Sequence, residues 1–207
     1  MRALLFLLML SLATPASAQL VIPLATVDGK VGCTQGMTGI GRPPGWTVVR
    51  DEDAPGGFAL SETTGDSTDL HFPFCISTEA ISKNFDATLR FKPVSGTREQ
   101  AGGLMFRAQD ATDYFVARAS ALDHTVKLYR MSGGRRSQLA SKEARVNAGQ
   151  WSELRVLAID KHIEVFFNGK SMFGYDDPGI VRPGAIGVWS PSDSVTHFGS
   201  LLVGPPG

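Results

Sequence analysis

The 207-residue sequence has few cysteines, few histidines and no surplus of either charge, and these deficits exclude several classes of function. Four widely spaced histidines form neither an H-x-H nor an H-E-x-x-H pattern, so no metal site is predicted from them. The 20 basic and 20 acidic side chains give a formal net charge of zero, which argues against nucleic acid or an anionic membrane as a partner. The one basic cluster, Arg135-Arg136, is interpreted as a solvated hairpin tip.

Nucleophile and phosphate motifs are missing as well. The sequence contains no G-x-S-x-G elbow, so a serine hydrolase is not indicated. Gly102-Gly103 precedes a predicted strand and no helix follows, so these glycines do not indicate a phosphate-binding loop. Beyond the N-terminal segment no apolar run is long enough to cross a bilayer, and no membrane span is expected in the mature chain.

The N-terminal segment itself is typical of a secretory signal. Arg2 supplies a positive n-region, residues 3–13 are almost wholly apolar, and Ala16-Ser17-Ala18 matches a small-x-small cleavage site. The alternative, a membrane anchor, needs ~20 apolar residues, and this run is shorter. We therefore predict a signal peptide over residues 1–18 and an exported protein, periplasmic or extracellular.

Because an exported protein reaches an oxidising compartment, the two cysteines are candidates for a disulfide bond. A bridge between Cys33 and Cys75 would tie the N-terminal segment to the first long predicted strand. Two separate buried thiols are the alternative, because the sequence does not show whether the two Cα atoms come within bonding range.

Short runs of alternating apolar and polar residues dominate the chain from Trp46 onward. Residues 85–92 alternate cleanly, and Asn168-Gly169 is a strong signal for a two-residue hairpin turn. About twelve such runs, with no helical period, predict an all-β, two-sheet antiparallel jelly-roll sandwich over residues 46–203. The glycine-rich segment 19–45 is interpreted as an N-terminal extension, and 204–207 as a tail. The predicted core residues are Trp46, Phe85, Leu89, Phe91, Phe106, Phe115, Leu154, Val156, Val165, Phe167 and Val188.

Two neighbouring predicted strands, 104–109 and 114–120, carry a polar face. Strict alternation places Arg107, Tyr114 and Arg118 on the side opposite Phe106 and Phe115. Arg90 or Arg130 is expected beside them. Arginine forks bind carboxylates and hydroxyls, and an aromatic ring stacks on the apolar face of a sugar. These five residues are therefore the predicted ligand-binding set, for a glycan or another polar ligand of the cell envelope; an exposed strand face kept soluble by arginine is the alternative.

The order of several motifs resembles that of the concanavalin A-like jelly-roll domains. Within that group the chain is similar to laminin G-like domains and to the bacterial 3-keto-disaccharide hydrolase-type domain. The motifs that carry the resemblance are residues 85–93, 103–107, 113–118, 149–151, 163–170 and 187–189. It implies two curved sheets with a ligand on the concave face or at the rim loops. It also implies either glycan or protein binding or, in the hydrolase branch, glycoside cleavage.

Binding without catalysis is the predicted function, and a glycoside hydrolase of the 3-keto-disaccharide type is the alternative. No strand shows the paired-carboxylate spacing E-x-D-x-x-E, and paired carboxyl groups are what glycoside hydrolysis needs. The acid–base candidates by residue type are Glu153, Glu164, His124 and His197.

No cofactor is expected, although calcium is a possible ligand. Asp110 and Asp113 share one predicted turn, and Asp176-Asp177 lies in another. Carboxylate oxygens are the ligands that calcium takes, whereas turn aspartates often cap their own backbone.

Overall fold

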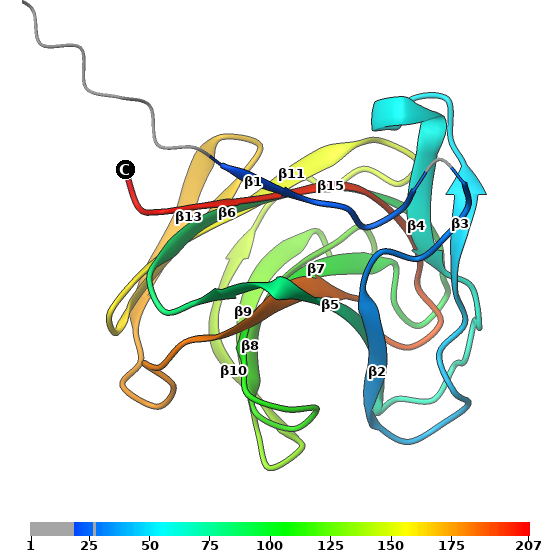
Figure 1. Cartoon of the computed structure of the whole chain (residues 1–207). Coiled ribbons are helices and arrows are strands. Elements are labelled where there is room, and N and C mark those ends of the chain that lie inside the picture. The colour runs from blue at the N-terminus through cyan, green and yellow to red at the C-terminus, as the bar shows by residue number, and fades with distance from the viewer. Residues whose placement is uncertain (1–18, 27) are drawn as a thin grey trace, which may run out of the picture.

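The computed structural model describes residues 19–26 and 28–207, which form two β-sheets packed face to face (Figure 1). The predicted signal peptide, residues 1–18, lies outside the described residues. The first sheet consists of β1 (Leu20–Ile22), β3 (Trp46–Arg50), β4 (Phe58–Glu62), β6 (Phe85–Ser95), β11 (Ser152–Ile159), β12 (His162–Phe167), β13 (Lys170–Asp176) and β15 (Val195–Gly204). The second consists of β2 (Thr34–Gly39), β5 (His71–Ser82), β7 (Ala101–Ala108), β8 (Tyr114–Ser120), β9 (Thr125–Ser132), β10 (Arg135–Glu143) and β14 (Gly184–Trp189).

Both sheets are antiparallel, and the predicted jelly-roll class is confirmed. The eight-stranded sheet has the order β13-β12-β11-β6-β15-β4-β3, with β1 paired to β15. The seven-stranded sheet has the order β10-β9-β8-β7-β14-β5-β2. One short 3-10 helix, Pro55–Gly57, precedes β4. Over the described residues, no helix has the length and apolar character that a membrane span requires.

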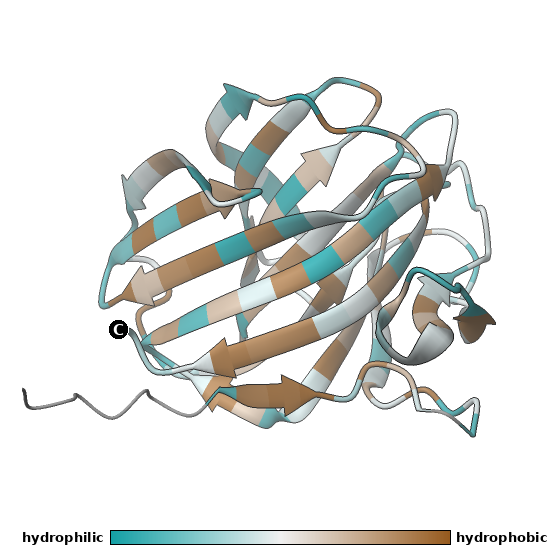
Figure 2. Cartoon of the chain, turned by 90° about the horizontal axis from the view of Figure 1, so that it is seen from above, coloured by the Kyte–Doolittle hydropathy of each residue, from teal (hydrophilic) through white to brown (hydrophobic). Residues whose placement is uncertain are grey.

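The hydrophobic core lies between the two sheets. All eleven predicted core residues belong to one buried cluster there, which confirms that prediction. The alternation is visible in Figure 2, where apolar and polar residues follow one another along the strands. Successive side chains of a strand point to opposite faces, so each alternating run delivers one apolar row to this core.

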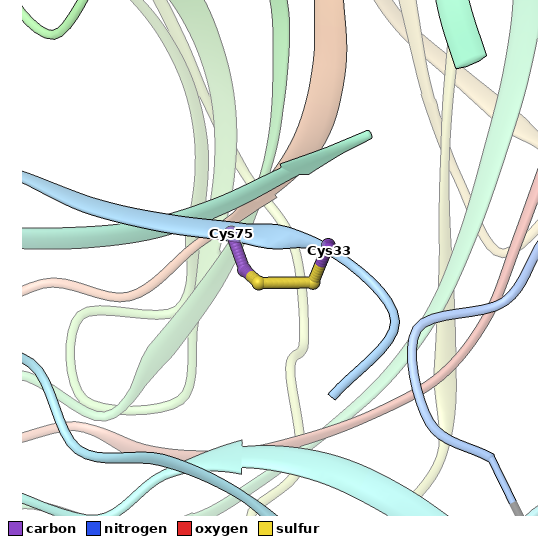
Figure 3. Close-up of a disulfide and its surroundings, with 2 residues drawn as sticks. All are labelled: Cys33 and Cys75. Carbon is purple, nitrogen blue, oxygen red and sulfur yellow. A yellow bond between two sulfur atoms is a disulfide. The ribbon is translucent and has the colours of Figure 1, made fainter. Parts of the chain in front are cut away.

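The glycine-rich segment differs from the extension that was expected. β1 pairs with β15 of one sheet, and β2 pairs with β5 at the edge of the other. The predicted Cys33–Cys75 disulfide is confirmed and joins the start of β2 to β5, with the two Cα atoms 5.4 Å apart (Figure 3). Glycine suits this edge strand because a Cβ at Gly36 would lie 2.4 Å from the ring of Phe74.

The outer face of the seven-stranded sheet is concave. The guanidinium of Arg136 lies 4.7 Å from the ring centroid of Phe72 on β5 and 4.8 Å from that of Tyr129 on β9. In a flat sheet β5 and β9 would be roughly 19 Å apart, four strand spacings of about 4.8 Å. One guanidinium reaches both rings because the sheet curls around this face.

Candidate functional site

Part of the concave face is filled by its own side chains. The hydroxyl of Tyr114 lies 2.9 Å from Thr38 Oγ1 on β2, and Trp189 Nε1 donates to it over 3.2 Å. Burial raises the pKa of Tyr114. The cluster beneath these bonds consists of Phe72, Phe74, Met105, Ala108, Tyr114, Val116, Tyr129, Met131 and Trp189. A ligand has no access to this part of the face.

The same face also carries an open cleft of about 410 Å³, which we call the rim cleft. Three loops and one edge strand contribute its walls: the loop before β5, the β6–β7 loop, the β14–β15 loop and β10. The lining residues are Asp69, Leu70, Arg98, Glu99, Arg136 and Ser192. Its volume is in the range of sites that hold small ligands.

The β6–β7 loop owes its shape to one aspartate. The carboxylate of Asp193 accepts hydrogen bonds from the backbone N–H groups of Thr97, Arg98 and Glu99, at 2.8–3.2 Å. Partial burial alone would raise the pKa of Asp193, but these bonds, together with one from the Thr97 hydroxyl, lower it to about 2. Gly96 has φ +150°, and a Cβ there would lie 1.8 Å from the carbonyl oxygen of Glu99. The loop thus presents Arg98 and Glu99 to the cleft in a fixed conformation.

Two ion pairs set the electrostatics of the rim cleft. Arg98 Nε donates to Asp69 Oδ1 over 2.8 Å. Arg118, whose side chain is only 3% exposed, donates to Glu99 Oε2 through Nη2 and to Asp123 Oδ2 through Nη1, the latter over 3.1 Å. Burial alone would lower the pKa of Arg118, yet the two carboxylates hold it above its ordinary value.

Each pair leaves one carboxylate oxygen free to bind. Asp69 Oδ2 and Glu99 Oε1 accept no hydrogen bond from any described residue. The guanidinium of Arg136 lies over two rings, and the side chain forms no hydrogen bond or ion pair within the described part of the chain. Leu70 adds an exposed apolar side chain, 56% accessible, to the same cleft. Donors, acceptors and an apolar contact therefore surround one small volume.

Arg107 does not lie on the polar face that the alternation predicted. Its side chain is fully buried, and its guanidinium donates to the backbone oxygens of Lys83, Ile180 and Asp160 at 2.6–3.0 Å. A β-bulge interrupts the alternation here: the β7–β14 register shifts, and Arg107 has φ +48°. Ala108 consequently packs in the concave-face cluster, whereas it was expected on the core side. Arg107 ties loops together and is closed to a ligand.

The other four predicted ligand-binding residues are dispersed. Tyr114 and Arg118 do share the concave face, but both are buried there. Arg130 lies between Tyr129 and Met131 on β9, so it points to the opposite face, where it pairs with Asp177 over 2.9 Å. Arg90 points outward from the other sheet, over the ring of Trp151. No single patch of these five side chains exists, because burial, the bulge and the sheet order separate them.

The acid–base candidates also lie outside the rim cleft. His197 Nδ1 lies 2.6 Å from Asp51 Oδ2, and Glu164 accepts a hydrogen bond from Ser171. Glu153 is exposed on β11. His124 lines a different cleft, of about 640 Å³, together with Asp123, Glu143, Ala144, Arg145 and Asn147.

The turn aspartates considered for calcium have hydrogen-bonding partners in their own surroundings. Asp110 accepts from the backbone of Thr112 and Asp113, and Asp177 pairs with Arg130. Asp176 lies 2.7 Å from His162. Within residues 19–26 and 28–207, no group of three or more His, Cys, Asp or Glu side chains is arranged to hold a metal ion.

Sequence reasoning missed most of the rim cleft. Arg136 was interpreted as a solvated tip, and Arg98 and Ser192 lie in loops that carry no periodic signal. These residues come from positions up to 123 apart in the chain, from Asp69 to Ser192, and only the folded sheets bring them together.

Comparisons with known proteins agree with this architecture. Residues 43–198 match the model of a family described as the 3-keto-alpha-glucoside-1,2-lyase-like domain. No curated protein matches the chain in sequence. Among solved structures, the carbohydrate-binding module CBM66 from Bacillus subtilis is similar, with a TM-score of 0.67 and 17% identity over 82% of this chain and 94% of that one.

Two further solved structures share the fold. A galectin-like protein of unknown function from Bacillus subtilis has a TM-score of 0.63 and 13% identity, over 90% of this chain and 94% of that one. Domain 4 of the extracellular arabinanase AbnA from Geobacillus stearothermophilus, solved with arabinotriose, has a TM-score of 0.57 and 15% identity over 85% of this chain and 83% of that one. At these identities the likeness shows the fold alone.

Proposed function

The chain belongs to the 3-keto-alpha-glucoside-1,2-lyase-like domain family, and from this premise we propose that it is an exported, non-catalytic module that binds carbohydrate in the rim cleft. The observation that carries the proposal is the convergence of unused polar groups around one cleft. Asp69 and Glu99 each offer a free carboxylate oxygen, and Arg98 and Arg136 offer N–H donors. Sugar hydroxyls both donate and accept, so they need this mixture of partners.

The solved neighbours support the same reading. One is named as a carbohydrate-binding module, and another was solved in complex with arabinotriose. Export is supported by the Cys33–Cys75 disulfide, because such bonds persist in oxidising compartments. The leader-like residues 1–18 point in the same direction.

Calorimetric titration against a panel of oligosaccharides tests this proposal. We expect Arg98→Ala to weaken binding of the best ligand roughly tenfold or more, because a hydrogen bond to a charged group contributes about 1.5–3 kcal/mol. Arg135→Ala removes another exposed guanidinium, one that does not line the cleft, and this variant should bind like the parent protein. Equal affinity of Arg98→Ala and the parent protein would reject this site.

Catalysis on a 3-keto-glycoside is the second candidate function. It is favoured by the family description and by the presence of two carboxylates, Asp69 and Glu99, in one cleft. Each of them already accepts hydrogen bonds from an arginine, an arrangement better suited to binding hydroxyls than to delivering a proton. Turnover of a 3-keto-glucoside by the purified protein, abolished in Glu99→Gln, would overturn the non-catalytic assignment.

A further inference from the structure

Arg136 differs from the other basic groups around the rim cleft because no carboxylate neutralises it. Arg98 pairs with Asp69, while Arg118 pairs with Glu99 and Asp123. Lys127, behind Arg118, also contacts Asp123 over 2.8 Å. Both carboxylates that line the cleft, Asp69 and Glu99, therefore have a basic partner, whereas the side chain of Arg136 forms no ion pair with any described residue. Of the two arginines that line the cleft, only Arg136 has no carboxylate partner among the described residues.

The same guanidinium is held in place before any ligand arrives. Its Cζ atom lies 4.7 Å from the ring centroid of Phe72 and 4.8 Å from that of Tyr129. Both rings are buried in the concave-face cluster, so the platform under Arg136 is fixed. A guanidinium stacked on rings keeps its in-plane N–H groups available. Less side-chain freedom is lost on binding when the group is already oriented.

We propose that the ligand of the rim cleft is an acidic saccharide, whose carboxylate forms a bidentate pair with Arg136. This inference rests on the proposed carbohydrate-binding function and names its substrate class. The planar fork of arginine matches a carboxylate with two parallel hydrogen bonds. The hydroxyls of the same sugar then bind Asp69 Oδ2, Glu99 Oε1 and the free N–H groups of Arg98, which places the acid at the β10 side of the cleft.

A matched pair of ligands tests the substrate class. A uronic-acid oligosaccharide and its methyl ester differ only at the carboxyl group, which is charged in the acid and is neutral and carries an added methyl group in the ester. Calorimetry gives both affinities. We expect the acid to bind roughly tenfold tighter than the ester at low salt, and the ratio to fall as salt is raised. Arg136→Gln should abolish the preference, and Arg136→Lys should restore only part of it because a lysine has no planar fork. Arg135→Gln, which removes the neighbouring charge, should keep the full ratio.

The possible outcomes distinguish failure of the acidic-saccharide inference from failure of the proposed carbohydrate binding. Equal binding of acid and ester, or a preference that survives in Arg136→Gln, would overturn the acidic-saccharide assignment while leaving carbohydrate binding intact. Tighter binding of a sulfated analogue than of the carboxylate would also overturn it, in favour of a site for sulfate groups. Failure of every saccharide to bind would overturn both. Because Arg136 is exposed, a melting curve of Arg136→Gln close to that of the parent confirms that the variant is folded.

Discussion

Arg118 is a buried residue that holds one of the side chains of the candidate site in position. Its buried guanidinium joins Glu99, on the β6–β7 loop, to Asp123, at the β8–β9 turn. Removing two charges from water is costly unless the pairing geometry is good, so the arrangement stabilises the protein only while both carboxylates stay in place. Arg118 is therefore a positioning residue that sets the place of Glu99 and is closed to a ligand.

Replacement of Arg118 should be among the more damaging single changes in this protein. We expect Arg118→Gln to lower the free energy of unfolding by about 1.5–3 kcal/mol, the range for losing hydrogen bonds to charged groups. Urea denaturation measures the loss. Arg118→Lys should not rescue it, because one ammonium does not reach both carboxylates with a planar fork. Arg135→Ala is the control and should stay within about 0.5 kcal/mol of the parent; an equally small effect of Arg118→Gln would contradict this account.

Among the elements, the loops between the sheets decide the shape of the rim cleft. The β6–β7 loop is held by Asp193, which lies on the β14–β15 loop, so two loops from distant parts of the chain form one wall. His71 at the start of β5 supports the same wall, since Ser192 N donates to its carbonyl oxygen over 2.7 Å. The cleft therefore keeps its form only while these loop-to-loop bonds persist.

Protonation of Asp193 at low pH should remove the stability that its hydrogen bonds to the β6–β7 loop contribute. The pKa of Asp193 is about 2 in the folded protein and about 3.9 in an unfolded chain. A carboxyl whose folded pKa is lowered contributes stability that is present above its unfolded pKa and is lost as pH falls through the folded pKa. We expect the difference in unfolding free energy between the parent and Asp193→Asn to be largest above about pH 5 and to shrink toward pH 2. Urea denaturation at several pH values measures this difference in unfolding free energy. A difference that does not change with pH would contradict the lowered pKa of Asp193. Glu79→Gln, at an exposed position, serves as the control.

At the scale of the whole molecule, contacts between distant parts of the chain join the N-terminal segment and the loops to the sandwich. β1 and β2 add to opposite sheets, and the disulfide fastens β2 to β5. Arg107 joins the β5–β6, β11–β12 and β13–β14 connections through three backbone oxygens. The edge strand β2 is bonded across the concave face to Tyr114 of β8 through Thr38 Oγ1.

Loss of the disulfide should lower the stability of the whole sandwich. The bridge closes a loop between residues 42 apart in sequence, and loop-closure entropy for that length corresponds to about 4 kcal/mol. We expect Cys33→Ser/Cys75→Ser to lower the free energy of unfolding by up to this amount, measured with urea. Adding a reductant should lower the unfolding free energy of the parent toward that of the double variant, and it should leave the unfolding free energy of the variant unchanged. Identical unfolding curves for the parent with and without reductant would contradict a stabilising role.

The sequence by itself determined the fold class and the strand-borne core, and it predicted the pairing of the two cysteines that the structure confirms. Alternation with period two depends only on local geometry, so residues such as Phe85, Leu89 and Phe91 could be assigned to the core without a structure. The same rule failed at Arg107, where a bulge shifts the register, and it could not reveal that Arg118 is buried. Tertiary structure alone decided the rim cleft, because Asp69, Glu99 and Arg136 meet through loop closure and sheet curvature. Those are long-range effects, which leave no periodic trace in the chain.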